Sequence, residues 1–148
     1  MTQKRGRIVV GVDGSEGSKS ALRWAAGQAR LTGAALEAVT AWESPAAHGW
    51  APVYAHNRDH DALTKKVLSE TIAATLGDSA VADITLIVAE GQPVHVILTA
   101  SQGADLLVVG SRGRGGFAGL VLGSVSQHCV QHAPCPVVVI PPEDWDKG

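Results

Sequence analysis

Glycine is concentrated in the stretch from Gly110 to Gly123, which holds six glycines in fourteen positions. Glycine loses more conformational freedom on folding than any other residue, so this density beside an apolar run needs a physical reason. Backbone without side chains lets N–H groups approach phosphate oxygens directly. A helix predicted to follow would point its partial positive charge at the same place. Arg112 adds positive charge and Ser124 and Ser126 add hydroxyl donors, which predicts a site for an anionic ligand, most simply a nucleotide phosphate chain.

Two common nucleotide-binding motifs do not explain this stretch. A P-loop requires G-x-x-x-x-G-K-[ST], and the sequence has no lysine between Lys66 and Lys147. Residues 113–118, GRGGFA, match the G-x-G-x-x-A dinucleotide fingerprint. That fingerprint belongs in the first strand–helix turn of a domain, with an acidic residue about twenty positions later. Here it follows the fourth predicted strand, so we do not assign a dinucleotide site.

Apolar runs alternate with helical patterns along the chain. The runs are continuous, as in strands that are covered on both faces. Right-handed crossovers between such strands give an open parallel α/β sheet with helices on both faces, and both the flavodoxin-like and the Rossmann strand orders fit this pattern. Strands are predicted at residues 7–12, 35–42, 83–88, 104–110 and 135–140, and helices at 15–32, 59–76 and 91–103 and from Gly119 or Leu120 to His132.

The ends of two predicted strands carry the chemistry that such a site needs. In open α/β sheets, ligands bind outside the carboxyl ends of the strands, where the strand order reverses. Asp13 follows the first predicted strand, and the glycine-rich stretch follows the fourth, so we expect both to contact the ligand. The alternatives are that Asp13 caps the helix beginning near Ser15 and that the glycines form only a flexible loop. The alternative for Ser124 and Ser126 is that their hydroxyls only accept hydrogen bonds from the free N–H groups at the start of the last helix.

Composition limits the partners and the location. The 148 residues fit one domain, 1–148, and the net charge of -2 gives no electrostatic footprint for nucleic acid or for an anionic membrane. No apolar run reaches the length of a membrane span, and Asp13 interrupts the first apolar stretch, so we expect neither a membrane segment nor a signal peptide. Cys129 and Cys135 fit a reducing compartment better than a disulfide scaffold, so a cytoplasmic location is expected.

Several other side chains are expected to have structural roles. Leu63 and Val67 belong to the apolar pattern of the helix at 59–76, and Trp42 is expected to pack rather than to contact a ligand. The loop at 43–57 is either a lid over a ligand or a plain connection. The histidines and cysteines match no common zinc-binding spacing, so no metal-ligand cluster is expected.

A longer spacing in the glycine-rich stretch is more specific. Gly110, Gly113 and Gly123, with Ser124 following, read G-x2-G-x9-G-S. This pattern resembles the ATP-binding signature of the universal stress protein family. The segments RIVVGVDGSEGSKSALRWAAGQA and ADLLVVGSRGRGGFAGLVLGSVSQHCVQHAPCPVVVIP are also similar to that family. The resemblance covers nearly the full chain and is weakest across residues 43–62.

The resemblance implies both a fold and a ligand. It implies the flavodoxin-like strand order 3-2-1-4-5, which places strands one and four side by side and Asp13 opposite the glycine-rich stretch. It implies ATP or another adenine nucleotide as the ligand. Because the sequence shows no dedicated cluster of acidic metal ligands, we expect any Mg²⁺ to be carried in by the phosphates. In ATP-binding members, the turn after strand one, the end of strand two, the end of strand four and the glycine signature contact the nucleotide. The matching residues are Gly11, Val12, Asp13, Ala41, Val109, Gly110, Arg112, Gly113, Gly123, Ser124, Val125 and Ser126.

The expected function is nucleotide binding in a stress response rather than dedicated catalysis, because no convincing general base stands near the expected γ-phosphate. The alternatives are a slow ATPase or nucleotide-dependent enzyme, a cyclic AMP binder, and an interaction protein that binds no nucleotide. The last predicted strand, 135–140, is an apolar edge that must be covered or paired. The family commonly dimerises through this strand, so we expect a homodimer with the two copies of 135–140 side by side.

Overall fold

The computed structural model describes residues 5–44, 57–112 and 122–141. These residues contain a five-stranded parallel sheet in the order β3-β2-β1-β4-β5, so the predicted open α/β sheet and its flavodoxin-like order are confirmed. Because β1 and β4 are neighbours, the ends of the first and fourth strands lie side by side, as a ligand site shared by Asp13 and the glycine-rich stretch requires. The strands are β1 (Arg7–Gly11), β2 (Ala35–Trp42), β3 (Ile84–Glu90), β4 (Leu106–Gly110) and β5 (Val137–Ile140).

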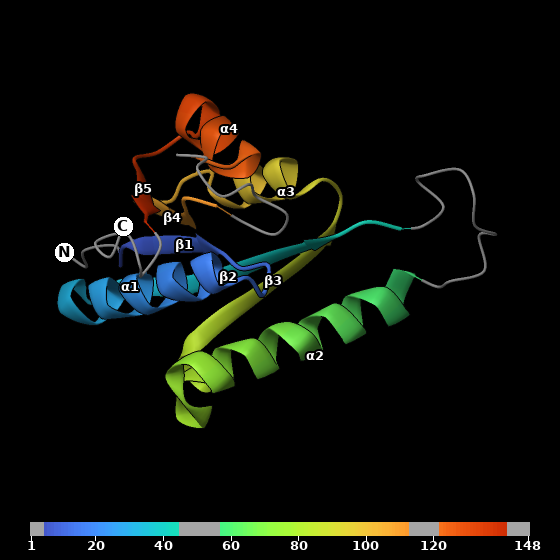
Figure 1. The fold of residues 1–148 in the computed structure, drawn as a ribbon. Coiled ribbons are helices and arrows are strands. Elements are labelled where there is room, and N and C mark those ends of the chain that lie inside the picture. The colour runs from blue at the N-terminus through green and yellow to red at the C-terminus, as the bar shows by residue number, and fades with distance from the viewer. Residues whose placement is uncertain (1–4, 45–56, 113–121, 142–148) are drawn as a thin grey trace.

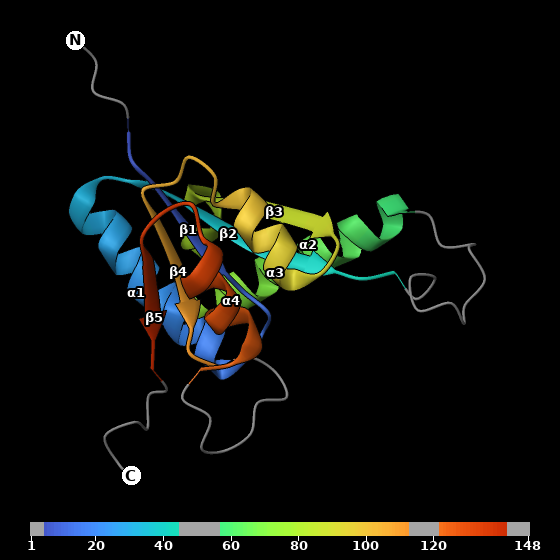
Figure 2. The same ribbon diagram turned by 90° about the horizontal axis from the view of Figure 1, so that it is seen from above.

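Helices cover both faces of the sheet. Figure 1 shows α1 (Glu16–Thr32) and α2 (Asn57–Leu76) below it and α3 (Pro93–Ala100) and α4 (Ser124–His132) above it. Figure 2, seen from above, places α3 and α4 in front of the strands. Across the three described ranges, no helix has the length and hydropathy that a membrane crossing requires.

The continuous apolar runs in the sequence are explained by a core on each side of the sheet. Along β1, Val10 packs with Leu22 and Ile72 on the side of α1 and α2. The neighbouring Val9 packs with Leu107 on the side of α3 and α4. Because consecutive side chains of a strand point to opposite faces, neighbouring positions of a strand covered on both sides are both apolar, as Val9 and Val10 are.

Local sequence signals fix the ends of α1. Ser15 is the N-cap, and its hydroxyl oxygen accepts a hydrogen bond from the N–H of Ser18 at 3.2 Å. Gly33 ends the helix in the left-handed region, at φ 75°, and donates its N–H to Ala29 O at 2.8 Å. Both ends agree with the predicted helix, and the alternative in which Asp13 caps α1 is wrong.

Several predicted boundaries differ from the observed ones, three of them for identifiable reasons. The last helix begins at Ser124, not at residue 119 or 120, because Gly123 is extended at φ -74° and ψ 171°. The third strand begins at Ile84, because the 3-10 helix η2 (Asp78–Asp83) occupies the preceding segment. The fifth strand begins at Val137, after Pro136, which has no backbone N–H to donate to a neighbouring strand.

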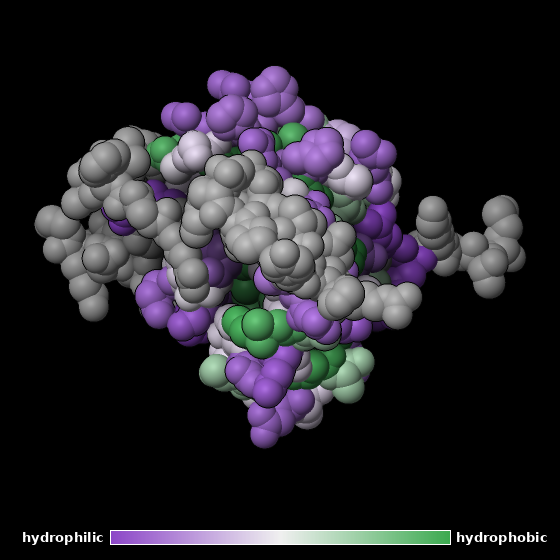
Figure 3. All heavy atoms as spheres, turned by 90° about the vertical axis from the view of Figure 1, so that its right-hand side faces the viewer, coloured by the Kyte–Doolittle hydropathy of each residue, from purple (hydrophilic) through white to green (hydrophobic). Residues whose placement is uncertain are grey.

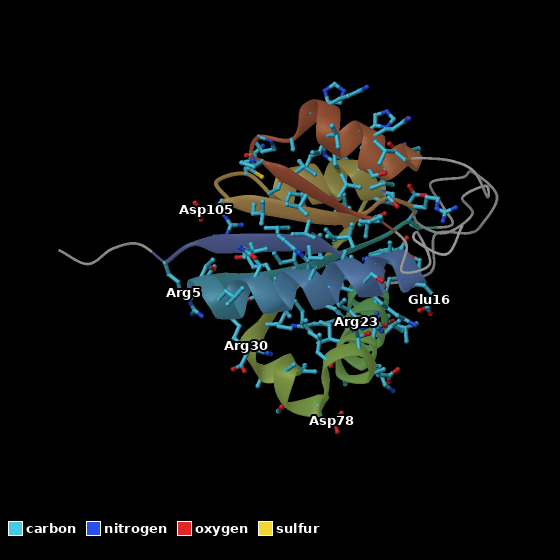
Figure 4. The ribbon with its side chains drawn as sticks, turned by 60° about the vertical axis from the view of Figure 1, so that its left-hand side comes forward. Arg5, Glu16, Arg23, Arg30, Asp78 and Asp105 are labelled. Carbon is cyan, nitrogen blue, oxygen red and sulfur yellow. The ribbon has the colours of Figure 1, made fainter. Side chains whose placement is uncertain are left out.

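Charged groups close the amino-terminal edge of the sheet. The guanidinium of Arg7 donates to both carboxylate oxygens of Glu37, each at 2.9 Å, and to Ala100 O at 3.0 Å. The Glu37 hydrogen bond raises the pKa of Arg7, and Asp105 accepts the backbone N–H of Arg7 at 2.7 Å. Figure 4 shows Asp105 at one end of the molecule and Glu16, at the start of α1, at the other. Ligands of open α/β sheets bind at the opposite edge, outside the carboxyl ends of the strands.

Both cysteines are free thiols, and burial lowers their reactivity. Cys129 is fully buried on α4, and Cys135 is half-buried before β5. Burial raises the pKa of Cys129 to about 11 and also raises the pKa of Cys135. Because the thiolate is the reactive form, the native protein at about pH 8 should react with a disulfide reagent slowly at Cys135 and only after unfolding at Cys129. A thiol-titration time course with and without guanidinium, with Cys135→Ser assigning the phases, tests this; prompt reaction of both native thiols would contradict it.

Candidate functional site

A cleft of about 920 Å³ opens at the carboxyl edge of the sheet. Eleven of the twelve residues predicted from the sequence line it, and the twelfth, Gly113, lies outside the described residues. They come from the ends of β1, β2 and β4, the segment after β4 and the start of α4. The eleven are Gly11, Val12, Asp13, Ala41, Val109, Gly110, Arg112, Gly123, Ser124, Val125 and Ser126.

The turn after β1 is fixed by its own side chains. The Asp13 carboxylate accepts the N–H of Ser15 at 2.9 Å, and the N–H of Asp13 donates to the hydroxyl of Ser18 at 3.2 Å. Val12 donates its N–H to Val39 O at 2.9 Å. The backbone N–H groups of Val12, Asp13 and Ser15 are therefore hydrogen-bonded within the protein. The turn holds Asp13 as an exposed carboxylate on the wall of the cleft.

Ser111 joins the end of β4 to the start of α4. Its N–H donates to Ile140 O at 2.8 Å, and its carbonyl accepts the N–H of Gly123 at 2.6 Å. The same carbonyl accepts the hydroxyl of buried Ser126 at 2.8 Å. These three donors, the N–H groups of Ser111 and Gly123 and the hydroxyl of Ser126, were expected to contact a ligand. They instead form hydrogen bonds within the protein and hold the two ends of the loop together.

The start of α4 supplies the remaining backbone donors. Its N-cap, Gly123, makes no side-chain capping bond, and the first hydrogen bond of the helix runs from Gln127 N–H to Gly123 O at 2.9 Å. The N–H groups of Ser124, Val125 and Ser126 therefore have no acceptor within the helix. Because these residues line the cleft, the positive end of the helix faces it.

Gly110 has a structural reason to lack a side chain. A Cβ atom added to it would lie 2.7 Å from the carbonyl oxygen and 2.8 Å from the carbonyl carbon of Gly17 in α1. A Cβ added to Gly17 would lie 2.5 Å from Arg112 O. The two glycines allow the first turn of α1 to touch the end of β4, so the close approach that the sequence suggested involves protein backbone as well as the cleft.

The sequence analysis missed the contribution of α2 to the cleft. Leu63 and Val67 line it and are 61% and 53% exposed, whereas the helix buries Leu68 and Ile72. Their placement in a core-facing pattern is therefore wrong. Trp42 packs, as expected, but it also lines the cleft.

The charges of the cleft are few and distinct. Among the lining residues that the structure describes, Asp13 is the only carboxylate, and Lys19 and Arg112 are the cations. Lys19 forms an ion pair with Glu16, with a Nζ–Oε1 distance of 3.2 Å. Within the described ranges, no three histidine, cysteine or acidic side chains gather as a metal-ligand group. The site can therefore hold an anion at α4 and an apolar group at α2.

An open doubly wound α/β sheet with an uncapped helix start at its switch point is an architecture typical of nucleotide-binding proteins. The sequence matches the Universal stress protein family over residues 4–141, and the chain belongs to this family. It is 36% identical over 135 residues to universal stress protein MT2698 of Mycobacterium tuberculosis, covering 89% of this chain and 44% of that protein. The chain spans less than half the length of the curated mycobacterial relatives it matches first.

Solved structures share the fold over nearly the whole chain. The universal stress protein UspA from Lactobacillus plantarum has a TM-score of 0.70 and 26% identity, covering 94% of this chain and 99% of that chain. A universal stress protein solved in complex with cAMP has a TM-score of 0.64 and 26% identity, covering 93% of this chain and 98% of that chain.

Proposed function

We propose that this protein binds an adenine nucleotide, ATP in particular, in the cleft and acts as a stress-response binding protein. The observation that carries the proposal is the uncapped start of α4, whose N–H groups face a cleft lined by eleven of the twelve residues expected from the sequence. The family membership supports it, as does the complex of a 26% identical universal stress protein with cAMP.

Different residues of the cleft suit different parts of the nucleotide. The N–H groups of Ser124, Val125 and Ser126 and the charge of Arg112 suit the phosphates. Ala41, at the end of β2, suits the base. A triphosphate chain reaches more of these groups than the single phosphate of cyclic AMP does, which favours ATP and the ATP-binding branch of the family.

The cleft also fits a magnesium ion carried by the nucleotide. Mg²⁺ is commonly held by one or two carboxylates together with substrate phosphates and waters. Asp13 provides one exposed carboxylate on the wall of the cleft. Bound in this way, Mg²⁺ would neutralise phosphate charge.

Binding rather than catalysis is proposed from the side chains of the cleft. Hydrolysis requires a base positioned on the attacking water. Asp13 is the only carboxylate, and no histidine occurs, among the lining residues that the structure describes. The Asp13 carboxylate accepts the N–H of Ser15 and so helps to hold the turn.

We also propose that the protein is a cytoplasmic homodimer that pairs through β5. One edge of β5 pairs with β4, and the sheet as described ends at its other edge. An unpaired edge strand with four valine or isoleucine residues is a template for a second strand. Two free thiols fit a reducing compartment. Light scattering during gel filtration should give twice the 15.3 kDa chain mass; a monomer would contradict the pairing.

Calorimetry with ATP, ADP, AMP and cyclic AMP, each with and without Mg²⁺, tests the nucleotide proposal. We expect ATP with Mg²⁺ to bind more tightly than AMP or cyclic AMP, because more of the phosphate donors are used. Binding also raises the melting temperature, because the ligand binds only the folded state. No heat and no thermal shift with any of the four would overturn the proposal.

A further inference from the structure

One face of α2 lies open along the cleft. Leu63, Val67 and Thr71 all line the cleft, and we call these three residues the α2 wall. They are spaced four residues apart, so they share one face of the helix over about 12 Å of its length. Leu63 and Val67 stay exposed at the cleft, whereas folding buries Leu68 and Ile72 on the adjacent face of the helix.

Trp42 forms the aromatic end of this compartment. Its ring stacks on His60 with a centroid distance of 4.8 Å and an interplanar angle of 20°. Its indole N–H donates to the Asp61 carboxylate at 2.5 Å, and its carbonyl accepts the N–H of Gly91 at 2.9 Å. Three contacts, two from α2 and one from the residue after β3, therefore fix Trp42, which also lines the cleft.

The two ends of the cleft have different chemistry. The end formed by Arg112 and the start of α4 is polar and positive. The end formed by the α2 wall and Trp42 is apolar. Figure 3, which views the side of the molecule at the right of Figure 1, shows a hydrophobic patch in its lower half, at the level of α2. A ligand that fills both ends must itself have an anionic part and a flat or apolar part.

We propose that the α2 wall and Trp42 form the base subsite of the cleft and select a purine nucleotide over a pyrimidine nucleotide. This inference rests on the proposed nucleotide function. Burial of apolar surface stabilises a complex roughly in proportion to its area, and the two rings of a purine cover more of Leu63, Val67 and Trp42 than one ring does. The selectivity thus comes from a helix that the glycine signature does not contain.

The test compares three ligands by calorimetry on the full chain: ATP, CTP and inorganic tripolyphosphate. Val67→Ser removes half of the apolar wall at an exposed position, so the fold is retained. Val130→Ser is the matched control, because Val130 is 51% exposed on α4 and does not line the cleft. We expect Val67→Ser to weaken ATP binding roughly five- to tenfold and to narrow the ATP-to-CTP ratio. Tripolyphosphate binding should be unchanged, and Val130→Ser should match the wild type.

Each other outcome is decisive. Unchanged ATP affinity in Val67→Ser and Leu63→Ser would overturn the base subsite while leaving nucleotide binding intact. An equal loss for tripolyphosphate would also overturn it, because the wall would then act on the phosphate end. A wild-type protein that binds tripolyphosphate but neither nucleotide would show a cleft for anions alone. A wild-type protein that binds none of the three would remove the proposed function itself, and this subsite with it.

Discussion

Replacing Gly110 by alanine should lower the free energy of unfolding by about 1–3 kcal/mol, the usual cost of forcing extra atoms into a packed region. The new Cβ would lie 2.7 Å from Gly17 O and 2.8 Å from the Gly17 carbonyl carbon. Both are backbone atoms, so no flexible side chain can move aside. Either the first turn of α1 or the end of β4 must shift. Chemical denaturation followed by circular dichroism measures the loss.

Gly27→Ala is the matched control, because it adds the same methyl group to α1 without a clash. A Cβ at Gly27 would meet no atom within 4 Å. Alanine is preferred over glycine inside a helix, so this variant should gain about 0.5–1 kcal/mol. If Gly110→Ala were as stable as the wild type, the contact between α1 and β4 would not be tight. The glycine would then be required only by the ligand.

The strands could be predicted because their local sequence and their environment agree. In the run 8–11 no position carries a polar side chain, and the structure covers both faces of the strand. The strand order could not be derived from these runs, which fit two topologies; it came from the family resemblance of the glycine signature. The candidate residues came partly from the chemistry of the strand ends and the glycine-rich stretch and partly from this resemblance, and eleven of the twelve line one cleft.

The features that sequence reasoning missed depend on contacts between distant segments. The start of α4 is set by the bond from Gly123 N–H to Ser111 O, at 2.6 Å, which no helical pattern encodes. The sequence of α2 contains two apolar patterns, one through Leu63 and one through Leu68. Which of them is buried depends on how the helix packs against the sheet, and the structure buries the one through Leu68. Likewise, only the folded chain shows which N–H groups are already hydrogen-bonded.

Those bonds concentrate the expected phosphate binding on the first turn of α4, where one substitution can test it. Ser124→Pro removes the N–H of Ser124 without removing a helical hydrogen bond, because the first residue of a helix has no intrahelical acceptor. The preceding Gly123 is extended at φ -74° and ψ 171°, close to the conformation that a residue before proline prefers. The variant should therefore keep its melting temperature close to that of the wild type.

We expect Ser124→Pro to weaken ATP binding roughly 10- to 100-fold, the value of one hydrogen bond to a charged group. Ser124→Ala is the matched control, because it removes the hydroxyl but keeps the N–H, so most of the affinity should remain. Calorimetry on both variants separates the two donors of this residue. If alanine costs as much as proline, the hydroxyl carries the contact. If neither variant changes the affinity, the phosphates lie away from the start of α4, and the observation that carries the nucleotide proposal is lost.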